Sequence, residues 1–298
     1  MDQFLDSWHS YRFRYCSVNN LGLNVNIING YRTQKMAENI YAIDEFGIDL
    51  MYLVLGQDKA MLVDTGAGIG KLKNVVEVFT EKPVFVVNTH GHMDHAMGNY
   101  EFPECYMNEK DLFLISPEYV TDERWKDFCE KTVREPYYDG PDLKNANLRL
   151  PQKLKPVEGG NKFDLGGYQY EVLETPGHTP GSIVLLDSEN RILIAGDSIV
   201  STPILIFNDY STTVEEYHKG LLKLLERENE FDLILPGHFL RPIGKTYLYD
   251  LIKCAEKILD GTVESEIVDF SHMSSEKAIK GMYGNASIVY NEKHIFNT

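Results

Sequence analysis

The sequence predicts an α/β fold in the form of a four-layered αββα sandwich, in which two mixed sheets stack face to face and helices flank them. Three observations support this prediction. Short runs of apolar and β-branched residues recur along the chain, as strands require. Two segments carry apolar residues at helical spacing, and a series of strands followed by one helix occurs twice. Two such halves can bury one face of each sheet against the other.

The first half is predicted to be a series of strands that ends in a helix. Residues 21–29 alternate between apolar and polar side chains like a strand, and an antiparallel meander follows over Ile40–Ile43, Asp49–Gly56 and Ala60–Asp64. Residues 70–80 form a helix candidate whose apolar face consists of Leu72, Val75, Val76 and Phe79. The β-branched run from Pro83 to Asn88 then predicts a buried strand.

The second half repeats this order. Its strands are predicted within Tyr168–Thr175, Ser182–Asp197 and Phe231–Gly237. The run from Thr212 to Glu215 matches a capping box, in which Thr and a Glu three residues later satisfy free backbone N–H groups. It predicts a helix to about Glu228, with a buried side made of Leu221, Leu222, Leu224 and Leu225.

Two stretches and a tail exceed what such a core needs, although the whole chain, 1–298, is expected to form a single domain. The insertion around 107–152 is rich in aromatic residues and predicts two helices, Glu109–Ser116 and Thr121–Arg134. It could roof a site or face solvent, packed by its own aromatics. Residues 200–210 form an apolar stretch suited to the wall of a substrate pocket. The C-terminal extension, 261–298, predicts a polar helix and a final strand, Ala286–Tyr290.

Composition excludes several classes of protein. The net charge of −16 argues against a nucleic-acid partner, which would require clustered Lys and Arg. No apolar run approaches the roughly 18–20 residues of a membrane span, so no membrane partner is expected. The four cysteines are scattered, without a C-x-x-C pair, which indicates reduced thiols and a cytoplasmic location. The expected partner is a small-molecule substrate, and a homodimer is left open.

The main chemical signal is the run Thr89-His90-Gly91-His92-Met93-Asp94-His95, which places three imidazoles and a carboxylate within six residues. Mixed nitrogen and oxygen ligands of this kind suit zinc, and also iron or manganese. The run follows the predicted strand 83–88, so the side chains would lie where a core strand gives way to a loop.

Three more segments repeat the arrangement of a strand, a small residue and then one His or Asp. They place His178, Asp197 and His238 where strand ends could gather along one edge of a sheet. With the first run, this makes five histidines and two aspartates, enough for two metal ions that share a bridging ligand.

In this order and spacing, the set resembles the metallo-β-lactamase-fold hydrolases, particularly their glyoxalase II and lactonase branches. The resemblance extends from Tyr52 to Phe239 and includes Leu62-Val63-Asp64-Thr65-Gly66. It implies that His90, His92 and His178 hold a first metal ion, and that Asp94, His95 and His238 hold a second. It also implies that Asp197 bridges both ions together with a water or hydroxide. Asp64 would orient ligands through hydrogen bonds without binding metal itself.

The expected ion pair explains how such a site could work without a Ser or Cys nucleophile. Neutral imidazoles leave the charge of the ions largely intact, which lowers the pKa of a bridging water towards ~7. The resulting hydroxide, between ions ~3.5–4 Å apart, would attack a carbonyl carbon. Asp94 is expected to act as the catalytic group that passes a proton.

Branch-specific positions narrow the function to hydrolysis of a small thioester, ester or lactone. Asp197 stands where β-lactamases usually have Cys, and His92 stands where flavodiiron proteins have Glu. Lactonases carry a Tyr shortly after the bridging Asp, whereas here Val200 lies three residues on and Tyr210 is far along the chain. The basic residues that glyoxalase II uses for glutathione have only loose counterparts, Arg241, Lys245 and Lys253.

Two alternatives remain within the same fold, and one outside enzymology. A persulfide dioxygenase would use a single iron, and a phosphodiesterase would need cationic side chains. Among the lysines and arginines, only Arg191 lies within ten residues of Asp94, His178 or Asp197. A non-catalytic scaffold would require a broken ligand set. The expected pocket is instead aromatic and aliphatic, and it draws on Trp125, Tyr137, Tyr138, Ile204, Ile206 and Phe207.

Overall fold

The computed structural model describes residues 25–132, 147–150, 154–238, 242–270 and 277–297. Its first sheet has eight strands in chain order. The first to the fifth strand pair antiparallel, and the fifth to the eighth strand pair parallel, so the fifth strand takes part in both arrangements. The predicted meander over residues 40–64 is confirmed. The strands are β1 (Val25–Ile28), β2 (Tyr31–Ala37), β3 (Ile40–Asp44), β4 (Leu50–Leu55), β5 (Ala60–Val63), β6 (Val84–Val87), β7 (Cys105–Met107) and β8 (Lys155–Pro156).

The second sheet has six strands in the order β15-β14-β12-β11-β10-β9. Only the β12–β14 pair is parallel, so this sheet is mixed, like the first. Its strands are β9 (Lys162–Asp164), β10 (Gln169–Glu174), β11 (Ile183–Asp187), β12 (Ile192–Gly196), β14 (Leu233–Pro236) and β15 (Ile243–Gly244).

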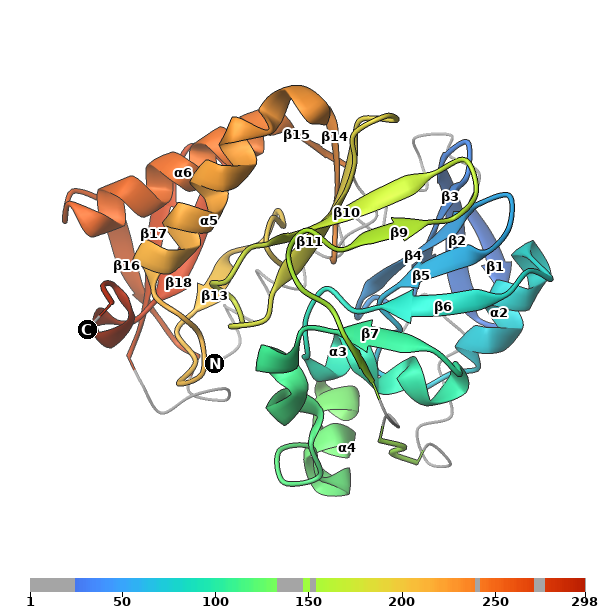
Figure 1. Cartoon of the computed structure of the whole chain (residues 1–298). Coiled ribbons are helices and arrows are strands. Elements are labelled where there is room, and N and C mark those ends of the chain that lie inside the picture. The colour runs from blue at the N-terminus through green and yellow to red at the C-terminus, as the bar shows by residue number, and fades with distance from the viewer. Residues whose placement is uncertain (1–24, 133–146, 151–153, 239–241, 271–276, 298) are drawn as a thin grey trace.

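The two sheets face each other across one apolar core, and helices cover their outer faces (Figure 1). Tyr52 and Met61 of the first sheet pack in the same cluster as Val172 and Leu185 of the second. Helix α2 (Leu72–Phe79) packs on the outer face of the first sheet. Helices α5 (Val214–Glu226) and α6 (Lys245–Leu259) pack on the second. The predicted αββα layers are therefore confirmed.

Helix α5 begins one residue later than the capping box predicts. Thr213, not Thr212, is the N-cap, and its hydroxyl accepts a hydrogen bond from the Glu216 N–H at 3.1 Å. Thr212 instead donates its own N–H to the carbonyl of Gly177, which holds it in the preceding loop. Of the four leucines assigned to the buried side of this helix, Leu222 is exposed.

A third sheet, absent from the prediction, joins the C-terminal extension to the core. Its order is β13-β18-β17-β16, with β13 (Ile204–Ile206), β16 (Glu264–Val268), β17 (Ala278–Tyr283) and β18 (Ala286–Tyr290). The final strand is thus confirmed. The prediction of a polar helix is wrong for the described part of the extension, where residues 264–268 and 278–283 are strands. Strand β16 is polar because it is an edge strand that is mostly exposed.

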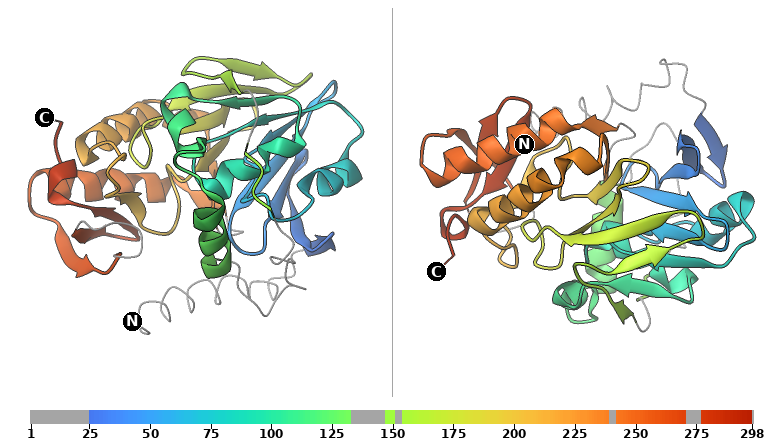
Figure 2. Two further views of the ribbon diagram at one scale, coloured as in Figure 1. Left: turned by 90° about the horizontal axis from the view of Figure 1, so that it is seen from below. Right: turned by 45° about the horizontal axis from the view of Figure 1, so that its top comes forward.

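The described residues of the insertion form one short 3-10 helix and one α-helix. The 3-10 helix is η3 (Glu109–Ile115), where an α-helix was predicted, and the α-helix is α4 (Asp122–Thr132). Helix α4 extends away from the sheets (Figure 2) but is anchored by Trp125, whose indole N–H donates to the carbonyl of Ala67 at 2.8 Å. The remaining short helices are α3 (Met93–Ala96), η2 (Met97–Glu101), η4 (Glu228–Glu230) and η5 (Glu292–His294).

Two further observations bear on the expectations from composition. Cys105, Cys129 and Cys254 are buried free thiols, while Cys16 lies outside the described residues. No helix in the described ranges has both the length and the apolar character that crossing a membrane would demand.

Candidate metal centre

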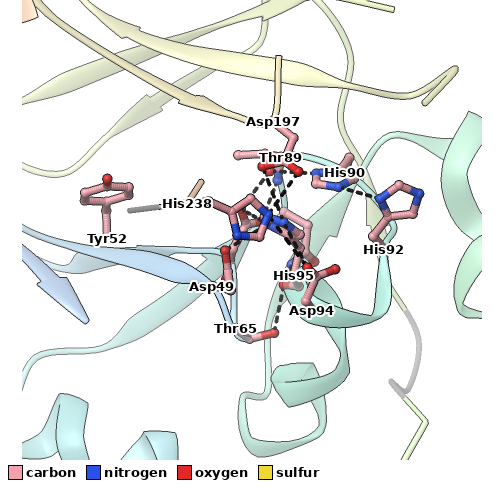
Figure 3. Close-up of polar contacts among 12 residues, drawn as sticks. Asp49, Tyr52, Thr65, Thr89, His90, His92, Asp94, His95, Asp197 and His238 are labelled. Carbon is pink, nitrogen blue, oxygen red and sulfur yellow. Dashed lines mark hydrogen bonds and ion pairs between the residues drawn. The ribbon is translucent and has the colours of Figure 1, made fainter. Parts of the chain in front are cut away.

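The predicted ligands come together at the edge where strands of the two sheets end. Figure 3 labels all of them except His178, whose Nε2 lies 2.9 Å from His92 Nδ1. Strand β6 leads into the loop of His90 and His92, and α3 then presents Asp94 and His95 from a single turn. The other three ligands follow strand β10, strand β12 and strand β14; they are His178, Asp197 and His238.

Three imidazoles form a first group that converges on one point. His92 Nδ1 lies 3.0 Å from His90 Nε2 and 2.9 Å from His178 Nε2. The same three residues form a group whose ligand atoms all lie within 4.8 Å of one another. Three ring nitrogens at this separation, on three different rings, fit the donor set of one metal ion.

A second group consists of His95, His238 and Asp94. The Oδ2 atom of Asp94 lies 3.9 Å from His95 Nε2 and 3.7 Å from His238 Nε2. Asp197 stands between the two groups. Its Oδ2 lies 3.1 Å from His238 Nε2 and 3.6 Å from His178 Nε2, and its Oδ1 lies 3.7 Å from His95 Nε2.

Two glycines, Gly196 and Gly237, allow the backbone of neighbouring segments to approach closely around Asp197. Gly237, just before His238, lies so near that a Cβ there would come within 2.6 Å of Asp197 Oδ1. Gly196 has a φ of +49°, and a Cβ there would meet the side chain of Thr89 at 2.4 Å. The small residue that precedes each ligand is therefore a steric requirement at these two positions.

The hydrogen bonds on the far side of the rings determine which nitrogen is free. A backbone carbonyl only accepts, so a ring nitrogen that faces one must carry the proton. His178 Nδ1 lies 2.9 Å from the Leu205 carbonyl, and His238 Nδ1 lies 2.7 Å from the Ile48 carbonyl. In the neutral rings, both Nε2 atoms then carry no proton and present a lone pair, and both lie near Asp197.

His95 leads to the same conclusion. Its Nδ1 lies 3.0 Å from Asp64 Oδ2, which leaves Nε2 without a proton in the neutral ring. Among the described residues, neither this buried Nε2 nor Asp197 Oδ1 has a hydrogen-bond partner. Lone pairs that face a carboxylate in a buried site need a cation between them, so these residues fit divalent metal ions.

The electrostatics of the ion-free site divide the imidazoles into neutral and protonated rings. Burial holds the pKa values of His90 and His92 well below their usual range, so both are neutral, the form that binds metal. Burial lowers the pKa values of His95 and His238, but nearby carboxylates, Asp49 beside His95 and Asp197 beside His238, raise them above their usual range, so these two rings would release a proton on binding a metal ion. Burial alone would raise the pKa of Asp197, but His238 and His95 lower it well below its usual range. Asp197 is therefore an ionised carboxylate among imidazoles.

Asp64 lies behind the ligands, as predicted. Its carboxylate accepts hydrogen bonds from the N–H and the hydroxyl of Thr89, both at 2.7 Å, and faces His95 Nδ1. Its backbone has a φ of +62°, which is uncommon for a residue other than glycine. Asp64 thus orients His95 while it ties β5 to the loop after β6.

Asp49 is a residue of the site that the sequence analysis missed. Its side chain is 2% exposed and its Oδ1 lies 3.4 Å from His95 Nδ1. It forms, with His95 and His238, a further group of potential ligand atoms. Neither Asp49 oxygen has a hydrogen-bond partner in the described ranges, and burial raises the pKa of Asp49 well above its usual range. The only signal in the sequence is an Asp at the start of an apolar strand.

Tyr210 lies at the site despite its distance from Asp197 along the chain. Its hydroxyl lies 2.7 Å from His92 Nε2. The ring also contacts two aromatics of the insertion, Phe113 and Tyr119, each at 6.0 Å between ring centroids. The aromatic part of the insertion therefore lies beside the first group of imidazoles.

The predicted apolar wall is mostly wrong. Ile204, Ile206 and Phe207 are buried in the cores around β13 and do not face the site. Trp125 is buried beneath the insertion, and Tyr137 and Tyr138 lie outside the described residues. The apolar side chains that are exposed in this region are Leu112 and Phe113, at 39% and 42%.

The basic residues compared with those of glyoxalase II are engaged elsewhere. Lys245 Nζ lies 3.1 Å from Asp232 Oδ1, and Lys253 Nζ lies 2.6 Å from Glu256 Oε2. Arg241 lies outside the described residues.

Comparisons with known proteins agree with the fold and the site. The model of the metallo-beta-lactamase superfamily matches residues 45–238. An uncharacterized protein of Aquifex aeolicus is 30% identical over 186 residues, which is 61% of this chain and 79% of that protein. The acyl-coenzyme A thioesterase MBLAC2 of Homo sapiens is 28% identical over 210 residues, 63% of this chain and 72% of the relative.

A bacterial relative and a solved structure complete the comparison. The hydroxyacylglutathione hydrolase GloC of Haemophilus influenzae is 26% identical over 192 residues, 61% of this chain and 81% of the relative. The metallo-beta-lactamase family protein TTHA1429 of Thermus thermophilus superposes with a TM-score of 0.54 at 21% identity. That match covers 72% of this chain and 76% of the other, and it bears on the fold alone.

Two stacked sheets with a His and Asp cluster at one edge define the class: a metal-binding hydrolase of the αββα fold. The chain belongs to the metallo-beta-lactamase superfamily.

Proposed function

We propose that this protein is a dinuclear metal-dependent hydrolase of a small thioester, ester or lactone, with an acyl thioester as the first choice. The observation that carries the proposal is the convergence of ring nitrogens on Asp197 from both sides. The choice of a thioester is supported by two relatives, which are named as an acyl-coenzyme A thioesterase and a hydroxyacylglutathione hydrolase.

Each residue has a place in this proposal. The first ion would be held by His90 Nε2, His92 Nδ1 and His178 Nε2, and the second by Asp94 Oδ2, His95 Nε2 and His238 Nε2. Asp197 would contribute one carboxylate to both. Zinc suits these donors, and iron or manganese would also fit them. When bound, the ions would supply Lewis acidity and a water of lowered pKa.

Asp94 is the group we assign to proton transfer. Asp94 lies in the first turn of α3 and its side chain remains 18% exposed, whereas the ring of His95 is fully buried. While Oδ2 would hold the ion, Asp94 Oδ1 would take a proton inside the site and release it to the leaving thiolate or alkoxide. His92, with Nδ1 directed at the first ion, donates its Nε2–H to the hydroxyl oxygen of Tyr210.

The surroundings favour an uncharged acyl group over a polyanion. Phe113 exposes apolar surface beside Tyr210, as a site for an acyl chain requires, and its neighbour in sequence Leu112 is also exposed. A phosphodiesterase would need cations to hold phosphate, and the only Lys or Arg within ten residues of Asp94, His178 or Asp197 is Arg191. Its side chain pairs with Asp232 at the surface. A single-iron dioxygenase would leave the second group of Asp94, His95 and His238 without a use.

Metal content is the first test. The purified full chain should hold close to two transition-metal ions, measured by elemental analysis against protein concentration. Removal by a chelator should abolish hydrolysis and leave the circular dichroism of the sandwich largely unchanged, because the core between the sheets does not depend on the ligands. One iron per chain with oxygen consumption would replace this proposal by the dioxygenase.

Substrate class is the second test. We expect turnover of acyl thioesters or lactones and little turnover of bis-aryl phosphodiesters by the same metal-loaded protein. The physical reason is the apolar rim and the scarcity of cations beside the ligands. A panel of thioesters, esters, lactones and phosphodiesters at equal metal loading provides the measurement. Fastest cleavage of the phosphodiesters would reject the substrate assignment and retain the dinuclear site.

A further inference from the structure

Asp111 lies where η3 of the insertion meets two ligand-bearing loops. The residue is completely buried, and its carboxylate accepts three hydrogen bonds. Oδ2 accepts the Gly91 N–H at 2.9 Å and the Thr179 hydroxyl at 2.6 Å, and Oδ1 accepts the Gly181 N–H at 2.7 Å. One side chain therefore connects three segments that are distant in sequence.

The fit around this carboxylate is steric as well as polar. A Cβ on Gly91 would lie 2.7 Å from the Asp111 carbonyl oxygen, and a Cβ on Gly181 would lie 2.7 Å from its carboxyl carbon. Both distances are shorter than real Cβ contacts. The two loops can approach Asp111 this closely only because glycine stands at both positions.

The connected residues are the immediate neighbours of the first group of imidazoles. Gly91 separates His90 from His92, and Thr179 follows His178. These are the only two loops that supply the first group. In the second group, by contrast, His95 is held by Asp64, and His238 by the Ile48 carbonyl.

We propose that Asp111 is a positioning residue for the first metal ion: it fixes the spacing between the loop of His90 and His92 and the loop of His178. This inference rests on the proposed dinuclear function. Hydrogen bonds to an ionised carboxylate are stronger and shorter than neutral ones, and Asp111 makes three of them. The insertion is thereby part of the metal centre, although it contributes no ligand.

The test is Asp111→Asn in the full chain, because an amide keeps the shape but turns one acceptor into a donor that faces N–H or O–H groups. We expect the affinity for one of the two ions to fall by roughly 10–100-fold, as with other residues that orient ligands. The other ion should change by less than about twofold. Stepwise titration of the metal-free chain with Co²⁺, followed by visible absorption, separates the two events.

Two further variants sharpen the experiment. Glu109→Gln alters an exposed carboxylate of the same 3-10 helix and should leave both affinities unchanged. Thr179→Val removes one of the three hydrogen bonds and should weaken the same ion by a smaller factor. It also tests the proposal if Asp111→Asn fails to fold.

The outcomes separate this inference from the proposed function. Unchanged binding of both ions, or an equal loss at both, would overturn the role of Asp111, since a general loss of stability does not select one site. A wild-type chain that takes up only one ion would contradict the dinuclear function. In that case, the role of Asp111 stands if Asp111→Asn weakens that ion and fails if it does not.

Discussion

Replacement of Asp197 by alanine is expected to remove both metal ions together and to reduce hydrolysis on the order of 10³-fold or more. Among the described residues, Asp197 is the one carboxylate within 4.0 Å of ring nitrogens of both groups, at 3.1 Å from His238 and 3.6 Å from His178. Metal ions contribute several kcal/mol to such reactions, and each 1.36 kcal/mol is a factor of ten. Elemental analysis and the rate on an acyl thioester give the two readouts.

Two other variants provide the comparison for Asp197→Ala. Asp64→Ala should weaken metal binding by roughly 10–100-fold without eliminating it, because Asp64 acts through His95 and Thr89. Glu189→Ala changes an exposed residue in the turn between β11 and β12 and should retain metal and activity. Equal metal loss from the Asp197 and Asp64 variants would mean that Asp64 is itself a ligand.

Replacement of Phe207 by alanine should destabilise the protein by about 3–5 kcal/mol, the usual cost of truncating a buried aromatic side chain. The sequence predicted instead that Phe207 lines the substrate pocket. The structure buries it completely, against Val268, Ala278 and Val289 of the third sheet. Denaturant unfolding followed by fluorescence measures the effect.

A matched control lies on the same sheet. Ile267 is 71% exposed, so Ile267→Ala should change the free energy of unfolding by less than about 0.5 kcal/mol. If Phe207→Ala retained full stability and raised KM only for long acyl chains, the side chain would face substrate and the described burial would be wrong.

The convergence of the proposed ligands could be predicted because the segments that carry them follow strands in sequence. His178, Asp197 and His238 come after runs whose apolar character is evident, and strands of one sheet bring their ends to a common edge. Local pattern and three-dimensional position therefore agree at these residues. The layers could be predicted for the same reason, since each half of the sandwich carries its own strands and helix.

The residues that were missed depend on contacts between distant segments. In the sequence, Asp49 cannot be distinguished from other polar residues that precede a strand. It belongs to the site because His95, which is distant in sequence, lies beside it. Tyr210 reaches His92 because β13 folds back along β18, a pairing between segments far apart in the sequence. The capping box was displaced by one residue because Gly177 binds the N–H of Thr212.

The parallel pairing of β13 with β18 has a consequence for the order in which the site can be assembled during synthesis. The Leu205 carbonyl that fixes the ring of His178 belongs to β13, and β13 has the late strand β18 as its neighbour. Asn291 also donates to the Phe207 carbonyl. The first sheet can therefore form early in synthesis, but His178 acquires its final support only after residues 286–291 have left the ribosome, so the proposed metal site would be completed late in folding.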